Sequence, residues 1–218
     1  LLAFFIFTTL GVLCKIPALS LLSVLSVILF IKQIKTQRKI AIIVTGVISF
    51  SIICIWYFYW VPYLLDTYHF QLYFPNGISE GLAEIYPLIP ELLEKFYFSS
   101  LHSYIAFVCC LAGVFILTKN KQKYLLYSIG IITIVFVVFI IKTGAVFPLH
   151  NYYIIPFTPI MALLAGYAID KIPTKYQYIL LFLISVEAIA NQQHDFRIKD
   201  SQLYKLELNS ITHQTIPK

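Results

Sequence analysis

Long apolar runs separated by short polar connections constrain this sequence more than any other feature. Several runs approach the roughly 20 apolar residues that are needed to cross a hydrocarbon core about 30 Å thick. Only 12% of the 218 residues are charged, whereas a soluble globular domain has about 25%. So few charges cannot cover a water-facing surface for a chain of this size, and the sequence predicts an integral membrane protein.

Only backbone-satisfied helices suit this setting, because an unpaired amide in lipid costs several kcal/mol. We therefore expect an all-α polytopic bundle of about seven transmembrane segments. The expected segments are 1–13, 18–31, 40–60, 103–117, 124–141, 153–169 and 178–190. Segments 18–31 and 178–190 are short, and the first two segments are also compatible with a hairpin that does not fully cross.

The expected membrane region covers residues 1–190, with one long connection at 61–100, and residues 191–218 begin a polar tail. The sequence opens with Leu1 inside an apolar run and has no basic region of the kind that starts a signal peptide. We therefore expect it to be part of a longer protein.

Basic residues gather in three short connections, which alternating segments would place on one side of the bilayer. These connections hold nine of the sixteen basic residues and only one acid, Asp170. By the positive-inside rule this side is cytoplasmic, so the long connection and the tail are expected to be extracytoplasmic. The clusters are Lys32, Lys35, Arg38 and Lys39; Lys119, Lys121 and Lys123; and Lys171 and Lys175.

The long connection contains an amphipathic stretch at 80–98. Its glutamates recur among Leu, Ile and Tyr at helical spacing, and Pro87 and Pro90 interrupt the pattern. Short helices that lie in the membrane interface have this character. The alternative, a solvated linker, fits the high apolar content less well.

Motifs of soluble catalytic and metal sites are missing from the sequence. It has no Gly-rich phosphate loop, HExxH or GxSxG motif, and no CxxC or Cys/His metal spacing. Its four cysteines lie in or at the edge of apolar runs, which favours packing roles. The net charge of +6 is confined to the connections, which argues against a nucleic-acid partner. We predict no cofactor and no metal.

Two lysines lie at the expected outer ends of apolar segments. Lys15 occupies the turn between the first two segments, and Lys142 precedes the short outer connection by one turn. A lysine at this depth either pairs with a phosphate at headgroup level or snorkels to mark a helix end. Both interpretations fit Lys15 equally, whereas snorkelling is the commoner explanation for Lys142.

Two aromatic stretches also face the expected outer side. One contains His150, Tyr152 and Tyr153 just before a segment that begins with Pro156 and Pro159, and the other is the run 56–63. Histidine beside paired tyrosines offers hydrogen-bond donors and a group that titrates near pH 7. Such groups suit a sugar or a diphosphate, but an aromatic belt at the membrane interface is the simpler explanation of both stretches.

These elements together resemble the GT-C class of membrane glycosyltransferases, which use a polyprenyl-phosphate sugar donor. The resemblance rests on the Lys-x-Pro element at Lys15 and Pro17, the Trp-Tyr run, the His150 to Tyr153 entry and the Pro156-x-x-Pro159 helix. The class includes the protein O-mannosyltransferases and the aminoarabinose transferases of lipid A. Most of residues 11–190 is covered by the resemblance.

The resemblance implies transfer of one sugar from a lipid-phosphate carrier to a lipid, glycan or protein acceptor on the outer face. By analogy, Lys15 meets the donor phosphate, while His150, Tyr152 and Tyr153 line the donor or acceptor pocket. Lys142 is a second possible phosphate partner, and Glu80 and Asp66 are weaker candidates for acceptor contacts. The carboxylate that the family uses as base has no matching position in this sequence.

Three other functions remain compatible with the sequence. A surface-polysaccharide polymerase or ligase is also lipid-linked and faces outward. A secondary transporter usually carries buried charge in broken helices at a repeat interface, and these segments are nearly free of charge. In a non-catalytic scaffold, the lysine, histidine and tyrosine elements would be incidental.

Overall fold

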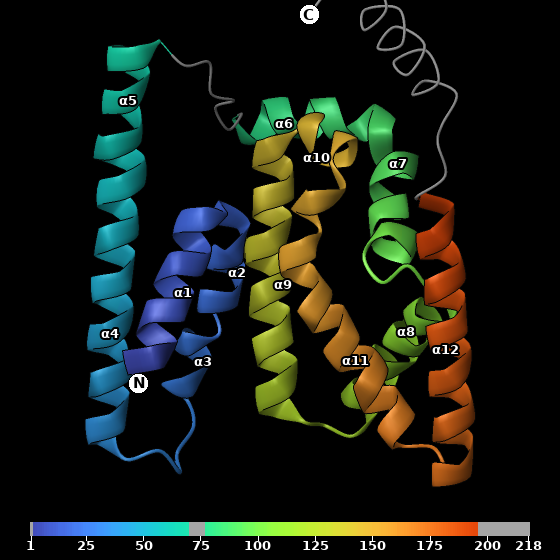
Figure 1. The fold of residues 1–218 in the computed structure, drawn as a ribbon. Coiled ribbons are helices and arrows are strands. Elements are labelled where there is room, and N and C mark those ends of the chain that lie inside the picture. Colours follow the sequence, from blue (N-terminus) through green and yellow to red (C-terminus); the bar gives the residue numbers. More distant parts are fainter. Residues whose placement is uncertain (1, 70–76, 196–218) are drawn as a thin grey trace, which may run out of the picture.

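The computed structural model describes residues 2–69 and 77–195, which form helices and turns and contain no strand (Figure 1). Residues 70–76 of the expected long connection, and the expected tail from residue 196 onward, lie outside the described residues. The elements are α1 (Leu2–Cys14), η1 (Ile16–Ala18), α2 (Leu19–Leu22), α3 (Leu25–Ile28), α4 (Thr36–Ile55), η2 (Trp56–Trp60), α5 (Val61–Tyr68), α6 (Ile78–Ile85), η3 (Tyr86–Leu88), α7 (Ile89–Glu94), η4 (Lys95–Ser99), α8 (Tyr104–Lys119), α9 (Lys123–Thr143), α10 (Val146–Leu149), η5 (Asn151–Tyr153), η6 (Ile155–Phe157), α11 (Thr158–Asp170) and α12 (Thr174–Asp195).

Within the described residues, three helical stretches are long and apolar enough to cross a membrane. They are Thr36–Tyr68, Lys123–Thr143 and Asn151–Asp170. A fourth is added if Ile78–Ser99 and Tyr104–Lys119, which bend by 96° at the break between them, act as one broken span. These helices indicate a membrane protein, as the sequence predicts, but the expected count of seven spans is not confirmed.

The expected segment 18–31 is a chain of short helical turns instead of one helix. Its serines recur at every third residue, and each hydroxyl donates to the carbonyl three residues earlier: Ser20 to Pro17, Ser23 to Ser20, and Ser26 to Ser23. Several backbone amides here also bond three residues back. Serine hydroxyls compete in this way with regular helical pairing, which explains the break between α2 and α3.

The helix that begins at Thr36 is longer than the expected segment 40–60. It continues through the π-helical turn η2 into α5 and ends at Tyr68. Pro62, whose nitrogen has no hydrogen to donate, lies just after this π-helical turn, where the regular helical pairing has already changed. Residues 61–68, expected as the start of the long connection, therefore extend this helix.

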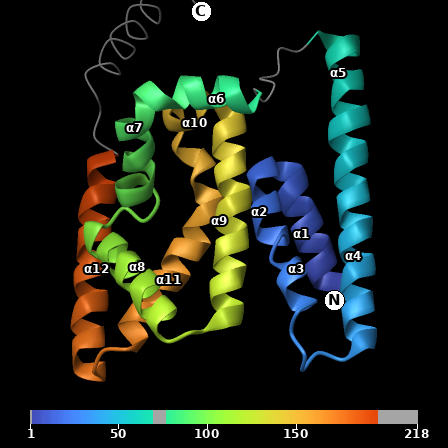
Figure 2. The ribbon, with the colours of Figure 1, turned by 180° about the vertical axis from the view of Figure 1, so that it is seen from behind.

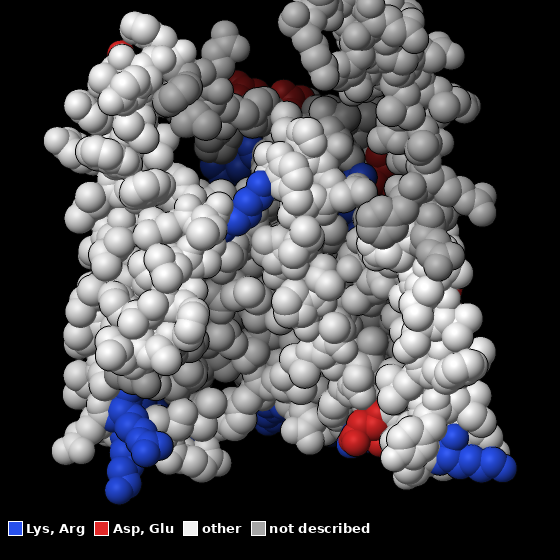
Figure 3. Space-filling model, viewed as in Figure 1, with Lys and Arg blue, Asp and Glu red and all other residues white. Residues whose placement is uncertain are grey.

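The three basic connections lie at one end of the molecule, here called the basic end (Figure 1). They join α3 to α4, α8 to α9 and α11 to α12, and Figure 3 shows Lys and Arg side chains gathered there. At the opposite end α6 lies across the tops of α9 and α10, as Figure 2 shows from behind. The stretch 80–98 is helical in α6 and α7, and the 3-10 turn η3 at Pro87 separates these two helices.

Close contact between α8 and α11 forms the centre of the bundle. A Cβ atom added at Gly113 of α8 would meet the carbonyl oxygen of Leu164 of α11 at 2.0 Å. Above this contact, Phe136 of α9 stacks on Phe157 with ring centroids 4.7 Å apart, and Phe96 packs edge-on against both rings. Small residues that let backbones approach are typical of helix packing in membranes.

Substituting Gly113 tests this contact. Gly113→Ala is expected to lower the free energy of unfolding by about 1–3 kcal/mol, because the new methyl group has to displace helix backbone. Thermal unfolding of the purified protein in detergent measures the change. Gly166→Ala in α11 is the matched control, since a Cβ there meets nothing within 4 Å. Equal melting temperatures for the two variants would contradict the close packing.

Candidate functional site

Lys15 lies where the first helix ends. Its amide donates to the carbonyl of Gly11 and its carbonyl accepts from the amide of Ala18, both at 3.0 Å. Its backbone is extended (φ −154°, ψ 111°), and Pro17 follows in the first turn of η1, where proline is readily accommodated. The end of α1 and the extended backbone of Lys15 place this residue at the tip of the α1–α2 hairpin. Figure 1 shows this tip below the level of α6.

The second part of the site is the turn between α9 and α11. It begins at Gly144, whose positive φ of 60° suits glycine. His150 has an extended backbone (φ −127°, ψ 118°) between α10 and η5. Phe147 is fully buried and stacks on Tyr153 with ring centroids 5.9 Å apart. This anchor leaves His150 and Tyr152 exposed and Tyr153 half-buried.

The fold brings these two parts together. The Lys15 Nζ lies 3.6 Å from the centroid of the Tyr152 ring and 4.4 Å from that of Tyr153. The His150 ring stacks on Tyr152 at 5.0 Å with an interplanar angle of 14°. An ammonium group this close to an aromatic face is attracted by the ring quadrupole. The result is one cation held above a histidine–tyrosine–tyrosine cluster.

Aromatic faces orient the Lys15 ammonium without cancelling its charge as a carboxylate would. Within residues 2–69 and 77–195, no carboxylate forms an ion pair with it. Burial lowers the pKa of Lys15 from its ordinary value, because the charged form loses hydration. A bound anion would restore favourable interactions to this partly desolvated cation.

A second lysine, Lys95, borders the same turn. Its Nζ donates to the Oδ1 of Asn151 at 2.5 Å, between His150 and Tyr152 in the sequence. Sequence reasoning did not single out this residue. One signal was available: Lys95 is the only basic residue of 61–100, a stretch that contains five acids.

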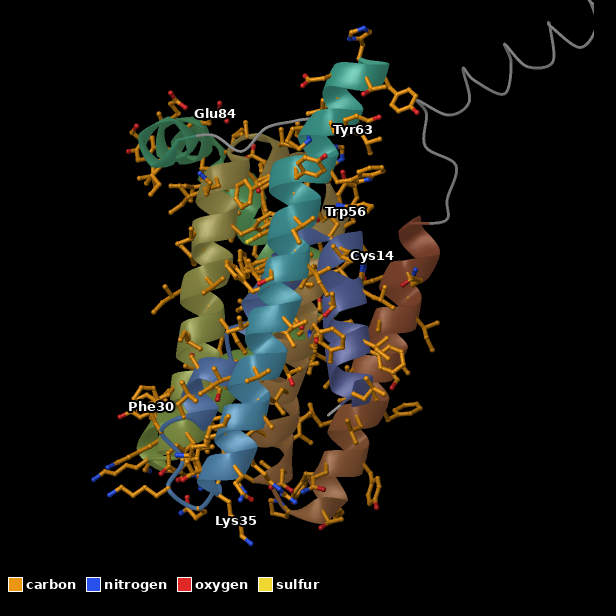
Figure 4. The ribbon with its side chains drawn as sticks, turned by 90° about the vertical axis from the view of Figure 1, so that its left-hand side faces the viewer. Cys14, Phe30, Lys35, Trp56, Tyr63 and Glu84 are labelled. Carbon is orange, nitrogen blue, oxygen red and sulfur yellow. The ribbon has the colours of Figure 1, made fainter. Side chains whose placement is uncertain are left out.

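The aromatic run 56–60, which forms η2 at the end of α4, supports the site. Tyr57 donates its hydroxyl to the carbonyl of Val12 at 3.1 Å, three residues before Lys15. Below this contact, Thr9 donates to Ser49 at 2.9 Å between α1 and α4, and both side chains are buried. Figure 4 shows Cys14 and Trp56 at a similar height on the two helices. The π-helical turn η2 therefore ties the Lys15 hairpin to the long helix.

Glu80, Asp66 and Lys142 are the other candidate residues. Glu80 accepts a bond from the amide of Gly77 at 3.0 Å and so caps α6. Asp66 is exposed on α5 and makes no contact with Lys15 within the described residues. Lys142 is half-buried in the last turn of α9. Glu84, which was not a candidate, accepts from the amide of Ala145 at 3.0 Å and joins α6 to the start of α10.

The chemistry of the cluster is that of anion and hydroxyl recognition. Lysine presents three N–H donors, and tyrosine and histidine each donate and accept hydrogen bonds. The described part of the chain contains no group of three His, Cys, Asp or Glu side chains placed to hold a metal ion. No family model, curated protein sequence or solved structure matches this chain.

A double-mutant cycle tests whether Lys15 and Tyr152 interact. Lys15→Met and Tyr152→Leu are each expected to destabilise the protein, with a coupling energy of about 0.5–2 kcal/mol. The coupling energy is obtained from the free energies of unfolding of wild type and of the single and double variants in detergent. The control cycle is Lys175 with Tyr176, an exposed pair whose Nζ-to-centroid distance is 5.9 Å. Additive effects at Lys15 and Tyr152 would show that the two side chains do not interact.

Proposed function

We propose that this protein is a membrane glycosyltransferase that moves a sugar from a polyprenyl-phosphate carrier to an acceptor at the end opposite the basic end. The observation that carries the proposal is the Lys15 ammonium above the rings of Tyr152 and Tyr153. The basic end faces the cytoplasm by the positive-inside rule, which makes the reaction extracytoplasmic.

The position of Lys15 suits a lipid-linked phosphate. The tip of the α1–α2 hairpin lies below α6 (Figure 1), so its cation is recessed from the end of the molecule. Below the tip, the apolar helix α1, which is one arm of the hairpin, packs against the apolar helix α4. A carrier whose tail remains among lipid can thus present its phosphate to the ammonium group at headgroup depth.

The chemical step concentrates charge on the carrier. The bond between the anomeric carbon and the phosphate oxygen breaks, and the acceptor oxygen forms the new bond to that carbon. The departing polyprenyl phosphate gains negative charge, which a preorganised ammonium stabilises most strongly in the transition state. The Tyr152 and Tyr153 rings hold Lys15 in place before the charge develops. The acceptor's proton passes to a base that we assign to no residue of this chain.

The cluster also offers contacts to the sugar. His150 and Tyr152 are exposed and stacked, so the imidazole and the phenol hydroxyl can bond sugar hydroxyl groups. Lys95 holds Asn151 through its Oδ1, which leaves the Nδ2 hydrogens as donors. Lys142 is a further candidate for the donor phosphate. The resemblance to the GT-C class agrees with these roles.

Sugar transfer by membranes that contain the protein tests the proposal. With a panel of radiolabelled polyprenyl-phosphate sugars, Lys15→Ala is expected to lower the rate on the order of 100-fold, as the loss of one transition-state donor does elsewhere. His150→Ala is expected to reduce transfer less. Lys175→Ala, an exposed lysine at the basic end, is the matched control. Undiminished transfer by Lys15→Ala would refute the role of this lysine.

The pH dependence of carrier binding gives a second test. Only the protonated ammonium binds phosphate, so affinity is present below the pKa of Lys15 and is lost as the pH rises through it. Because burial lowers this pKa, the loss is expected below pH 10.5, the ordinary value. Lys15→Arg is expected to retain binding to higher pH, since arginine stays charged. Native mass spectrometry or calorimetry of polyprenyl monophosphate binding in detergent measures the affinity of wild type and of Lys15→Arg at each pH. Identical pH dependence of the two affinities would contradict the role of Lys15.

A further inference from the structure

A groove between α3 and α4 lies away from the Lys15 site. Its volume is about 270 Å³, and its walls are apolar apart from Ser26. The α4 wall includes Ile42, Gly46 and Phe50, which recur every four residues and so follow one face of the helix for about 12 Å. Gly46 has no side chain to fill the groove, and a Cβ there would lie 3.6 Å from the Leu25 Cδ1.

The groove opens toward a cluster of four cations at the basic end. Lys39 marks this opening: its Nζ donates at 2.7 Å to the carbonyl of Leu29, a residue that lines the groove. The other three are exposed in the same connection and at the start of α4: Lys32, Lys35 and Arg38. Figure 4 shows Lys35 and Phe30 at this end, and the Phe30 side chain is 73% exposed.

Nothing nearby in the sequence neutralises these cations. The first acid of the chain is Asp66, near the far end of the same long helix. At the basic end, Asp170 pairs with Lys171 in the connection between α11 and α12. Figure 3 shows the Lys and Arg side chains below α3 and α4 with no acidic side chain among them on the face in view. Within the described residues no carboxylate forms an ion pair with this cluster, which leaves its charge available to an anionic ligand.

We propose that this site binds an anionic phospholipid of the adjoining leaflet, with one acyl chain in the groove and the phosphate among the four cations. An apolar groove that ends in a cationic cluster matches the two halves of such a lipid. Clusters of four to eight Lys or Arg residues beside a membrane helix attract anionic lipids. A second copy of this chain fits less well, because a two-fold interface here would bring two basic clusters together.

The test compares lipid retention by the full chain and its variants. The protein is reconstituted in nanodiscs of equimolar phosphatidylglycerol and phosphatidylcholine, released into detergent and examined by native mass spectrometry. Wild type is expected to retain phosphatidylglycerol in preference to phosphatidylcholine. Replacing Lys35, Arg38 and Lys39 together by Gln is expected to reduce that preference by roughly tenfold or more.

Two matched controls separate the site from general attraction to a charged bilayer. Replacing Lys119, Lys121 and Lys123 by Gln removes three cations from another basic connection and is expected to preserve the preference. Gly46→Leu fills the groove and is expected to abolish retention, whereas Gly46→Ala fits the available space and is expected to preserve it.

Three outcomes would overturn the proposal. Equal losses in the two triple variants would mean diffuse electrostatic attraction and no site. Unchanged retention in Gly46→Leu would mean that no acyl chain occupies the groove. A dimer in the mass spectrum that Gly46→Leu dissociates would assign the groove to a second copy. Melting temperatures of the variants in detergent show whether each remains folded. If Gly46→Leu does not fold, the comparison of the two triple variants still decides between a specific site and diffuse attraction.

Discussion

The close approach of α8 to α11 is the contact on which the rest of this bundle depends. In lipid, helices associate through van der Waals packing instead of the hydrophobic effect, so the absence of a side chain at Gly113 matters more than it would in water. The backbone carbonyl of Leu164 occupies the space that a side chain at Gly113 would need. The contact sets the course of α11, and the Asn151–Phe157 turns that begin this helix carry Tyr152 and Tyr153. Packing at the centre thus determines where the aromatic rings of the site lie.

The site differs from an ordinary surface ion pair in how its cation is held. A carboxylate beside Lys15 would neutralise its positive charge. The ring faces of Tyr152 and Tyr153 instead hold the ammonium group in place, and its charge remains available to bind an anion. Tyr57 and Phe147 support the two sides through a hydrogen bond and a ring stack. A preorganised cation is what the proposed transfer requires, because the departing lipid phosphate gains negative charge.

The two ends of the molecule have different chemistry. The opposite end carries the acids of α6 and α7 and the recessed lysine–tyrosine cluster. The basic end carries short connections rich in lysine, and one of them borders the groove beside α4. Such asymmetry is expected of a protein that stands across a bilayer with different surroundings on its two sides. The proposed transferase site and the proposed lipid site therefore both present cations to a lipid phosphate, but at opposite ends of the molecule.

The sequence by itself determined the all-helical class, the membrane setting and the grouping of lysines in short connections, because hydrophobicity and charge are local properties of the chain. It also pointed to Lys15, His150, Tyr152 and Tyr153 and placed them on the same side of the membrane. It did not predict the breaks in 18–31, where serine hydroxyls compete for carbonyls, or the extension of the α4 helix to Tyr68. Only the tertiary structure decided that Lys15 meets the two tyrosines, that Lys95 borders their turn and that Glu80 caps a helix. Such contacts join residues far apart in the chain, and packing at Gly113, Phe136 and Tyr57 sets them.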